Sequence, residues 1–229
     1  MTRAVVFDIE GTIGDISFVR NVLFPYARER LLDHLKSNWD SGQIRPIVEA
    51  ARQASGQALA TPAQATAQFA AWIDEDRKIT PLKTLQGLIW REGYETGVLK
   101  AHLYDDAVTL IRNLARSGKR LFIYSSGSID AQKLYMAYSV AGNLTGLIED
   151  YFDTTTGPKA EVASYVKIAE HIGLRPRDIT FFSDAVSEVT AARAAGFAAT
   201  CVNRTPANPV QGLEPGTPVI SDFSQATIS

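Results

Sequence analysis

Polar residues that could perform chemistry directly follow short apolar runs at several places in the sequence. Asp8 and Glu10 come after the first such run, and Gly11 and Thr12 follow them. Two carboxylates this close repel each other unless one is protonated or a cation lies nearby. Magnesium would remove the repulsion, because it prefers a few carboxylates together with water and phosphate oxygens. Gly11 allows a tight turn that directs backbone N–H groups toward a ligand.

A second set of residues is suited to binding an anion. Ser125 and Ser126 follow another apolar run and precede a helical pattern, and Lys159 precedes a further one. Hydroxyls and free N–H groups at the start of a helix form an anion site. Ser and Gly are equally common in ordinary turns, and a lone lysine is usually a surface charge. Neither segment identifies a site by itself.

Asp184 ends a third apolar run, and Glu188 follows four residues later. Alone, Asp184 could cap the next helix and Glu188 could favour its first turn. Taken with the other segments, however, the set contains a carboxylate nucleophile, a second acid, a hydroxyl, a lysine and a metal-binding aspartate. Phosphoryl transfer requires charge neutralisation and a held nucleophile, which these residue types supply. The order of the segments therefore predicts a phosphoryl-transfer enzyme.

These residues can meet only if the apolar runs pair as strands of one sheet. Three runs indicate buried strands, at 4–7, 120–124 and 179–183, and weaker ones lie at 198–202 and 218–220. Helical patterns alternate with them, at 105–117, 129–139, 160–172 and 187–195. The alternation predicts an α/β fold with a Rossmann-like parallel sheet and helices on both faces. Right-handed crossovers would bring the carboxyl ends of the strands to one edge, where ligands bind.

About 110 residues separate the first two strands, far more than a crossover needs. Helical patterns fill this stretch at 16–38, 44–54, 62–78 and 81–98. Pro25 should kink or restart the first helix. Thr61 and Thr80, each followed by proline, look like N-caps of the last two. We predict a core of residues 1–14 and 101–229, with an all-helical cap of residues 15–100 inserted after the first strand.

Composition limits the classes of partner. The chain has 229 residues, and its 23 basic and 25 acidic residues give a net charge of −2. This balance argues against nucleic-acid binding and against polybasic attachment to membranes. The single cysteine, Cys201, can form neither an internal disulfide nor a multi-thiolate zinc site. No apolar stretch has the length of a membrane span or signal peptide. We expect a cytoplasmic protein, and a monomer is the default.

The order of the motifs resembles the haloacid dehalogenase superfamily of phosphatases over nearly the whole chain. A narrower resemblance, to the enolase-phosphatase (acireductone synthase) family, includes Glu10, where most superfamily phosphatases have aspartate. The segments that carry it are Ile16-Ser17-Phe18-Val19, Leu23-Phe24-Pro25-Tyr26-Ala27, Thr80-Pro81-Leu82-Lys83, Leu85-Gln86-Gly87, Ile89-Trp90 and Tyr124-Ser125-Ser126-Gly127-Ser128. The resemblance implies enolisation and dephosphorylation of a small phosphorylated metabolite, 2,3-diketo-5-methylthiopentyl-1-phosphate, in methionine salvage.

The resemblance also implies residue roles in catalysis. Asp8 would attack phosphorus and form an aspartyl phosphate, and Glu10 would serve as general acid and then as base. One magnesium ion would be held by Asp8, by Asp184 and by the Glu10 position through its backbone carbonyl. The base for enolisation stays open between Glu10 and a residue of the cap.

Phosphate binding is assigned in the same way. The resemblance implies that Ser125, the N–H of Ser126 and Lys159 hold the phosphate. The sequence departs from the expected pattern at Pro158, which stands where a histidine is expected before Lys159. This departure concerns the shape of the loop and the fit of the substrate, because the lysine itself is present.

Two other readings share these motifs. A capped magnesium phosphatase for a sugar or glycolate phosphate would have the same core. A non-catalytic protein that binds phosphorylated metabolites would keep the fold, although the complete set of charged residues argues against it. A halide-removing enzyme is a poorer candidate, because it would not need Glu10 and Asp184 as a metal pair.

Overall fold

The computed structural model describes residues 1–228. The chain divides into two compact units, one formed by Met1–Ile16 and the chain from Lys100 onward, the other by Ser17–Leu99. Each unit has its own buried hydrophobic cluster. No helix among the described residues is long and apolar enough to cross a membrane.

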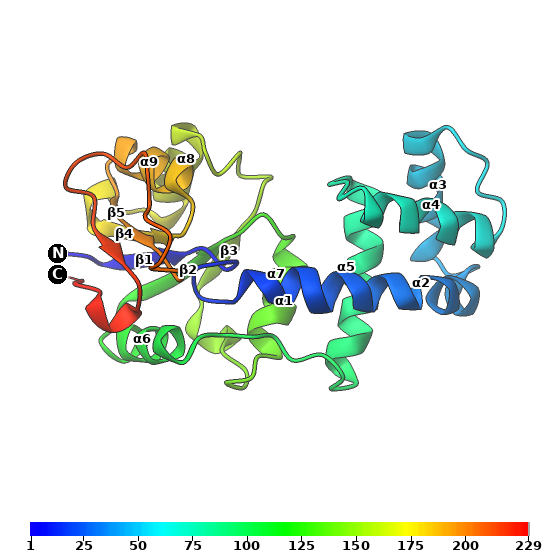
Figure 1. Ribbon diagram of the computed structural model, residues 1–229, viewed down its shortest axis with the longest axis horizontal. Coiled ribbons are helices and arrows are strands. Elements are labelled where there is room, and N and C mark those ends of the chain that lie inside the picture. The colour runs from blue at the N-terminus through cyan, green and yellow to red at the C-terminus, as the bar shows by residue number, and fades with distance from the viewer. Residues whose placement is uncertain (229) are drawn as a thin grey trace. The chain divides into compact units, whose positions relative to one another are not determined.

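The first unit contains a parallel sheet that confirms the expected fold class (Figure 1). Within the described residues six strands have the order β3-β2-β1-β4-β5-β6, and every neighbouring pair is parallel. Their bounds are β1 Ala4–Phe7, β2 Arg120–Tyr124, β3 Asp150–Phe152, β4 Ile179–Ser183, β5 Ala198–Val202 and β6 Val219–Ile220. All the expected strands are present. The sequence did not indicate β3, because three residues are too few for a recognisable apolar run.

Helices cover both faces of the sheet. Figure 1 shows α8 (Val162–Ile172) and α9 (Val186–Ala194) on one side and α6 (Asp105–Arg116) on the other. The fourth helix of this unit, α7, spans Ile129–Ala137. One hydrophobic cluster joins β1, β2, β4 and β5 to α8 and α9, with Phe181 and Tyr165 fully buried. Burial of each such side chain contributes roughly 1.5–3 kcal/mol, so the sheet is a firm base for the loops at its edge.

Cys201 lies within this cluster, as expected for a small buried hydrophobic residue. Its side chain is fully buried in β5. Burial, and then the charge of Asp184, raise the pKa of the thiol to about 11. The thiol is therefore protonated at neutral pH and acts as a packing group.

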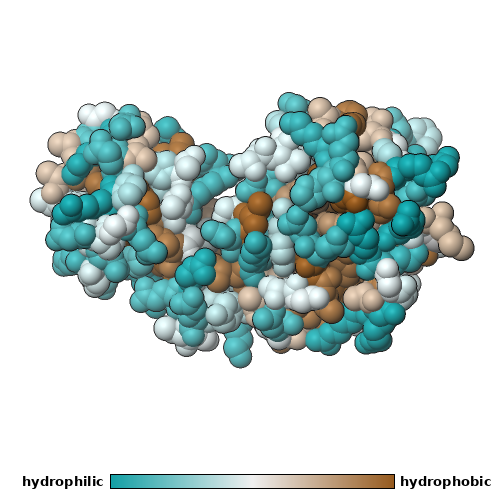
Figure 2. All heavy atoms as spheres, turned by 180° about the vertical axis from the view of Figure 1, so that it is seen from behind, coloured by the Kyte–Doolittle hydropathy of each residue, from teal (hydrophilic) through white to brown (hydrophobic). Residues whose placement is uncertain are grey.

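The second unit is helical. It begins within α1 (Ile16–Phe18), whose first residue belongs to the other unit, and continues with a π-helical turn at Val19–Leu23, α2 Phe24–Asn38, α3 Ile44–Ser55, α4 Pro62–Asp74 and α5 Thr80–Glu95. At Pro25, where a kink or restart was expected, the backbone stays right-handed helical, and the proline occupies the second position of α2, directly after the π-helical turn. The helix expected at 62–78 ends earlier, because Asp76 adopts φ 51° and Arg77 N–H bonds back to the Trp72 carbonyl, as in a Schellman motif. In the space-filling view of the whole molecule in Figure 2, hydrophilic residues, drawn in teal, prevail on the surface of both units.

The two expected N-caps differ. The Thr61 hydroxyl accepts a hydrogen bond from the Gln64 N–H at 3.3 Å, which confirms this cap. The Thr80 cap is wrong: the N-cap residue is Ile79, and Thr80 is the first residue of α5. Proline is tolerated at both of the first helical positions, because neither N–H has a partner inside the helix.

We predict that Thr61→Ala lowers the free energy of unfolding of the helical unit by about 1 kcal/mol, because the N-cap acceptor is lost. Thr80→Ala should change it by less than about 0.5 kcal/mol. All three tryptophans, Trp39, Trp72 and Trp90, lie in this unit, so urea unfolding followed by tryptophan fluorescence reports on it. Equal destabilisation by the two variants would contradict the assigned caps.

Candidate active site

Asp8 stands at the carboxyl end of β1, in the middle of the sheet. Its N–H donates to the Phe182 carbonyl at 2.9 Å and so extends the β1–β4 ladder past the strand. The chain then turns sharply, because the Ile9 carbonyl accepts hydrogen bonds from the N–H groups of residues 12–14 at 2.9–3.1 Å. This turn brings the Thr12 hydroxyl back to donate to Asp8 Oδ2 at 3.0 Å.

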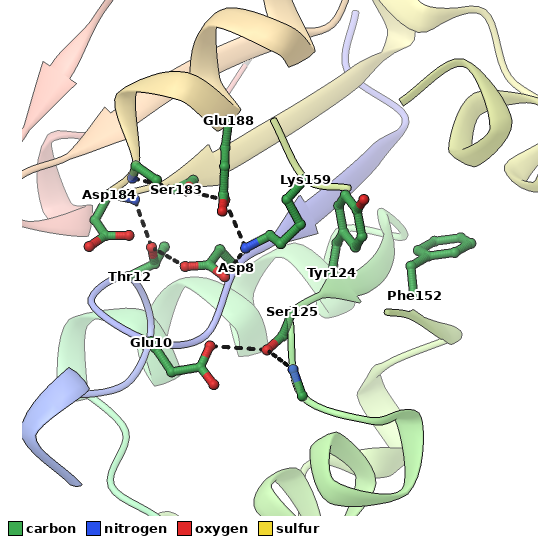
Figure 3. Close-up of polar contacts among 12 residues, drawn as sticks. Asp8, Glu10, Thr12, Tyr124, Ser125, Phe152, Lys159, Ser183, Asp184 and Glu188 are labelled. Carbon is green, nitrogen blue, oxygen red and sulfur yellow. Dashed lines mark hydrogen bonds and ion pairs between the residues drawn. The ribbon is translucent and has the colours of Figure 1, made fainter. Parts of the chain in front are cut away.

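The same hydroxyl connects Asp8 to the end of β4. Thr12 Oγ1 accepts the backbone N–H of Asp184 at 2.9 Å (Figure 3). Gly11, between them, adopts φ 79°, and a Cβ there would overlap the Asp184 carboxylate. Only glycine suits this position, since it has the left-handed conformation and no side chain. Asp8 and Asp184, distant in sequence, thus share one hydroxyl at the carboxyl edge of the sheet.

Lys159 reaches the same point from the loop before α8. Its ammonium forms ion pairs with Asp8 Oδ1 and, at 2.7 Å, with Glu188 Oε2. Glu188 also accepts a hydrogen bond from the Ser183 hydroxyl at 2.7 Å. Burial alone would lower the pKa of Lys159, but the charges of Asp8 and Glu188 outweigh it and raise the pKa above its ordinary value. The lysine is therefore charged.

Glu10 contacts the loop after β2. Ser125 donates its hydroxyl hydrogen bond to Glu10 Oε2 at 3.0 Å and accepts the Gly127 N–H at 3.2 Å. Ser126, next in this loop, is exposed. The pKa of Glu10 is raised, first by burial and then by the charge of Asp8. A carboxyl group with a raised pKa holds a proton more readily than an ordinary one, as a general acid requires.

Negative charge exceeds positive charge in the cluster drawn in Figure 3. Among its described residues the carboxylates are Asp8, Glu10, Asp184 and Glu188, and the cation is Lys159. Asp184 is exposed, yet the protein displaces enough water around its carboxylate to raise the pKa to about 7, with further contributions from Asp8 and Glu188. Burial and then the charge of Asp8 raise the pKa of Glu188 in the same direction. The cluster is thus suited to a further cation.

Magnesium fits the donors that are present. No group of three or more His, Cys, Asp or Glu within residues 1–228 is arranged to hold a metal ion. Magnesium instead takes one or two carboxylates and completes its octahedron with water and phosphate oxygens. The Thr12 hydroxyl donates to the Asp8 carboxylate and accepts the backbone N–H of Asp184, so both residues are held at the same edge of the sheet, and their two carboxylates match this requirement.

The structure brings together the residues singled out from the sequence and adds others. Contacts through Thr12 and the lysine ammonium join Asp8, Asp184 and Lys159. A separate hydrogen bond joins Glu10 to Ser125, and the charges of Asp8 and Lys159 act on Glu10. Ser126 adjoins Ser125. Sequence reasoning gave no site role to Thr12 or Glu188, because each alone is typical of a turn or a helix start.

Asp153, directly after β3, is a further polar residue at a strand end that the sequence did not indicate. It accepts hydrogen bonds from the N–H groups of Thr155 at 2.8 Å and Ile129 at 3.4 Å, and so ties this strand end to the start of α7. Its sequence signal is weaker than at the other strand ends, because only two apolar residues, Tyr151 and Phe152, precede it.

Known proteins with similar sequences are hydrolases of one family. The family model of haloacid dehalogenase-like hydrolases matches residues 2–196. Proteins named Enolase-phosphatase E1 are 46% identical over 229 residues in Alcanivorax borkumensis, covering all of both chains, and 43% identical over 227 residues in Aquifex aeolicus, covering 99% of this chain and 97% of that one.

Solved structures agree with these relatives. The Saccharomyces cerevisiae UTR4 protein is 33% identical, with a TM-score of 0.83 over 99% of this chain and 100% of that one. An L-2-haloacid dehalogenase from Xanthobacter autotrophicus, 17% identical with a TM-score of 0.57 over 97% of this chain and 96% of that one, shares the fold. By sequence and structure together, the chain belongs to the haloacid dehalogenase-like hydrolases and, among them, to the enolase-phosphatase family.

Proposed function

We propose that the chain is a magnesium-dependent enolase-phosphatase that forms an aspartyl phosphate on Asp8. The proposed substrate is 2,3-diketo-5-methylthiopentyl-1-phosphate of methionine salvage. The observation that carries the proposal is the Asp8 carboxylate, which accepts hydrogen bonds from Lys159 and Thr12 while Glu10 lies two residues away. Membership of the enolase-phosphatase family supports the substrate. A cytoplasmic monomer is part of the proposal.

Asp8 and Glu10 divide the chemistry of the phosphatase steps. An oxygen of Asp8 attacks phosphorus, and Glu10 gives a proton to the leaving alkoxide oxygen. Glu10, now ionised, takes a proton from water as that water attacks the aspartyl phosphate, which releases phosphate and restores Asp8. The raised pKa of Glu10 suits it to both directions of proton transfer.

The remaining residues hold charge in place. Lys159, Ser125 and the N–H of Ser126 bind the phosphoryl oxygens, where fixed positive charge stabilises the transition state. Bound magnesium, held by Asp8, Asp184 and the backbone carbonyl of Glu10, supplies further neutralisation of the transferring group.

Enolisation requires removal of a proton next to a carbonyl. Glu10 is the candidate base in the core, and a residue of the helical unit is the alternative. We propose that this unit, within residues 15–100, is a cap inserted into the core of residues 1–14 and 101–229. The unit is inserted into the core soon after the turn that carries Asp8 and Glu10. Because an insertion can change in sequence without altering the sheet, we expect its residues to determine which substrate fits.

Asp8→Asn should abolish phosphate release. The amide is not a nucleophile for phosphorus, so we expect at least about a thousandfold lower kcat. Phosphate release from 4-nitrophenyl phosphate with magnesium measures this, and EDTA should abolish the activity of the unchanged protein. Asp33→Asn, at an exposed aspartate of α2, is the matched control with full activity. Activity of Asp8→Asn within tenfold of the unchanged protein would exclude Asp8 as nucleophile.

Glu10→Asp should slow turnover more than it weakens phosphate binding. Loss of one methylene withdraws the proton by roughly 1 Å, which costs on the order of a hundredfold in rate. Single-turnover kinetics give the rate, and inhibition by inorganic phosphate gives the binding. Glu49→Asp, at an exposed glutamate of α3, serves as control. An unchanged single-turnover rate in Glu10→Asp would remove Glu10 from the proton-transfer role.

A further inference from the structure

The loop that carries Lys159 is held by an unusual set of hydrogen bonds. Its three consecutive backbone carbonyls, at residues 157–159, each accept a hydrogen bond from a side-chain hydroxyl. In chain order the donors are Tyr124 at 2.9 Å, Ser164 at 2.7 Å and Tyr165 at 2.7 Å. We call these three residues the hydroxyl clasp.

The members of the hydroxyl clasp come from two rigid elements. Tyr124 is the last residue of β2, and Ser164 and Tyr165 lie in the first turns of α8. All three residues are buried, with at most 1% of their surface exposed. The Tyr165 ring also packs edge to face on Tyr124, Phe181 and Phe197, with centroids 5.2–5.7 Å apart. Side chains packed in this way have a single position, so they can fix the loop.

The loop residues themselves fit the hydroxyl clasp. Gly157 adopts φ 152°, and a Cβ there would overlap the Ser164 hydroxyl oxygen. Pro158 has no N–H, so its carbonyl is its one backbone hydrogen-bonding group. That carbonyl accepts both the Ser164 hydroxyl and the Glu161 N–H at 3.0 Å. Pro158, which stands where a histidine is expected, therefore lies in a segment whose backbone carbonyls are all held by hydrogen bonds.

The reaction gives this anchoring a purpose. The Lys159 ammonium is paired with Asp8 and Glu188. In the proposed function, on which this step rests, Asp8 becomes an aspartyl phosphate and its oxygen no longer carries the carboxylate charge. Lys159 then loses one of its two ion-pair partners, Asp8, while the phosphoryl group that it must hold is still present. The backbone of the loop must therefore keep the lysine side chain in position.

We propose that Tyr165, with Tyr124 and Ser164, is a positioning residue for Lys159. Among the described residues its hydroxyl hydrogen-bonds to the Lys159 carbonyl, six residues before it, so its effect on the reaction would come through the position of the ammonium group. A shift of about 1 Å in a group that binds the transition state can cost up to a hundredfold in rate.

A double-mutant cycle with Lys159 tests the proposal. Tyr165→Phe removes one oxygen and should lower kcat/KM for 4-nitrophenyl phosphate by about ten- to a hundredfold. In the Lys159→Met background the same change should alter kcat/KM, measured at high enzyme concentration, by less than about twofold, because the group it positions is gone. The affinity for inorganic phosphate with magnesium, measured by calorimetry in the same four proteins, should follow the same pattern without requiring turnover.

The matched control is Tyr151→Phe. Tyr151 is a buried tyrosine of β3 whose hydroxyl has no hydrogen-bond partner in the described structure, so full activity is expected. Ser164→Ala provides a second, smaller change should Tyr165→Phe fail to fold, which melting curves reveal. Equal losses in both backgrounds, or no loss beside intact Lys159, would overturn the positioning role. Full activity of Lys159→Met alone would instead overturn the proposed function of the lysine.

Discussion

A surplus of carboxylates around one buried lysine is the constraint on which this site depends. Asp8 and Glu188 pair with Lys159, and the charge of the lysine also acts on Glu10 and Asp184. Burial and mutual repulsion nevertheless raise the pKa of Glu10, Asp184 and Glu188. Buried carboxylates without enough positive partners lower the stability of a protein. Such groups are found mostly at functional sites, where their charge binds a ligand or takes part in the reaction. A divalent cation and a phosphoryl group, bound together, would bring both the positive charge and the reacting atom that this arrangement lacks.

Neutral hydroxyls hold the charged groups in this arrangement. Asp8 accepts a hydrogen bond from Thr12, Glu10 from Ser125 and Glu188 from Ser183, at 2.7–3.0 Å. The hydroxyl clasp fixes the backbone of Lys159 by the same kind of contact. A hydroxyl orients a carboxylate without cancelling its charge, whereas a second lysine or arginine would neutralise it and lower its pKa. The site therefore keeps its charge and its geometry at once.

The sequence predicted the sheet, and placed candidate site residues at its strand ends, because both depend on local signals. An apolar run that stops at a polar residue marks a buried strand and its carboxyl end, which located Asp8, Ser125 and Asp184. The short strand β3 lacks such a run, so Asp153 at its end escaped notice. Glu188 pairs with Lys159, which is distant in sequence, and Tyr165 bonds to the Lys159 carbonyl across a loop. No pattern in the sequence indicates either contact. The prediction of Thr80 as an N-cap is wrong because proline fits both the first and the second position of a helix, so a Thr-Pro pair does not fix where the helix begins.

Chemical trapping of the proposed intermediate tests the account most directly. Enzyme quenched during turnover and reduced with borohydride can be digested and mapped by mass spectrometry, since reduction converts an aspartyl phosphate into homoserine. We expect homoserine in place of Asp8 when substrate and magnesium are both present, and an unchanged Asp8 when EDTA removes the metal. An unmodified Asp8 during active turnover, or modification at another carboxylate instead, would contradict it.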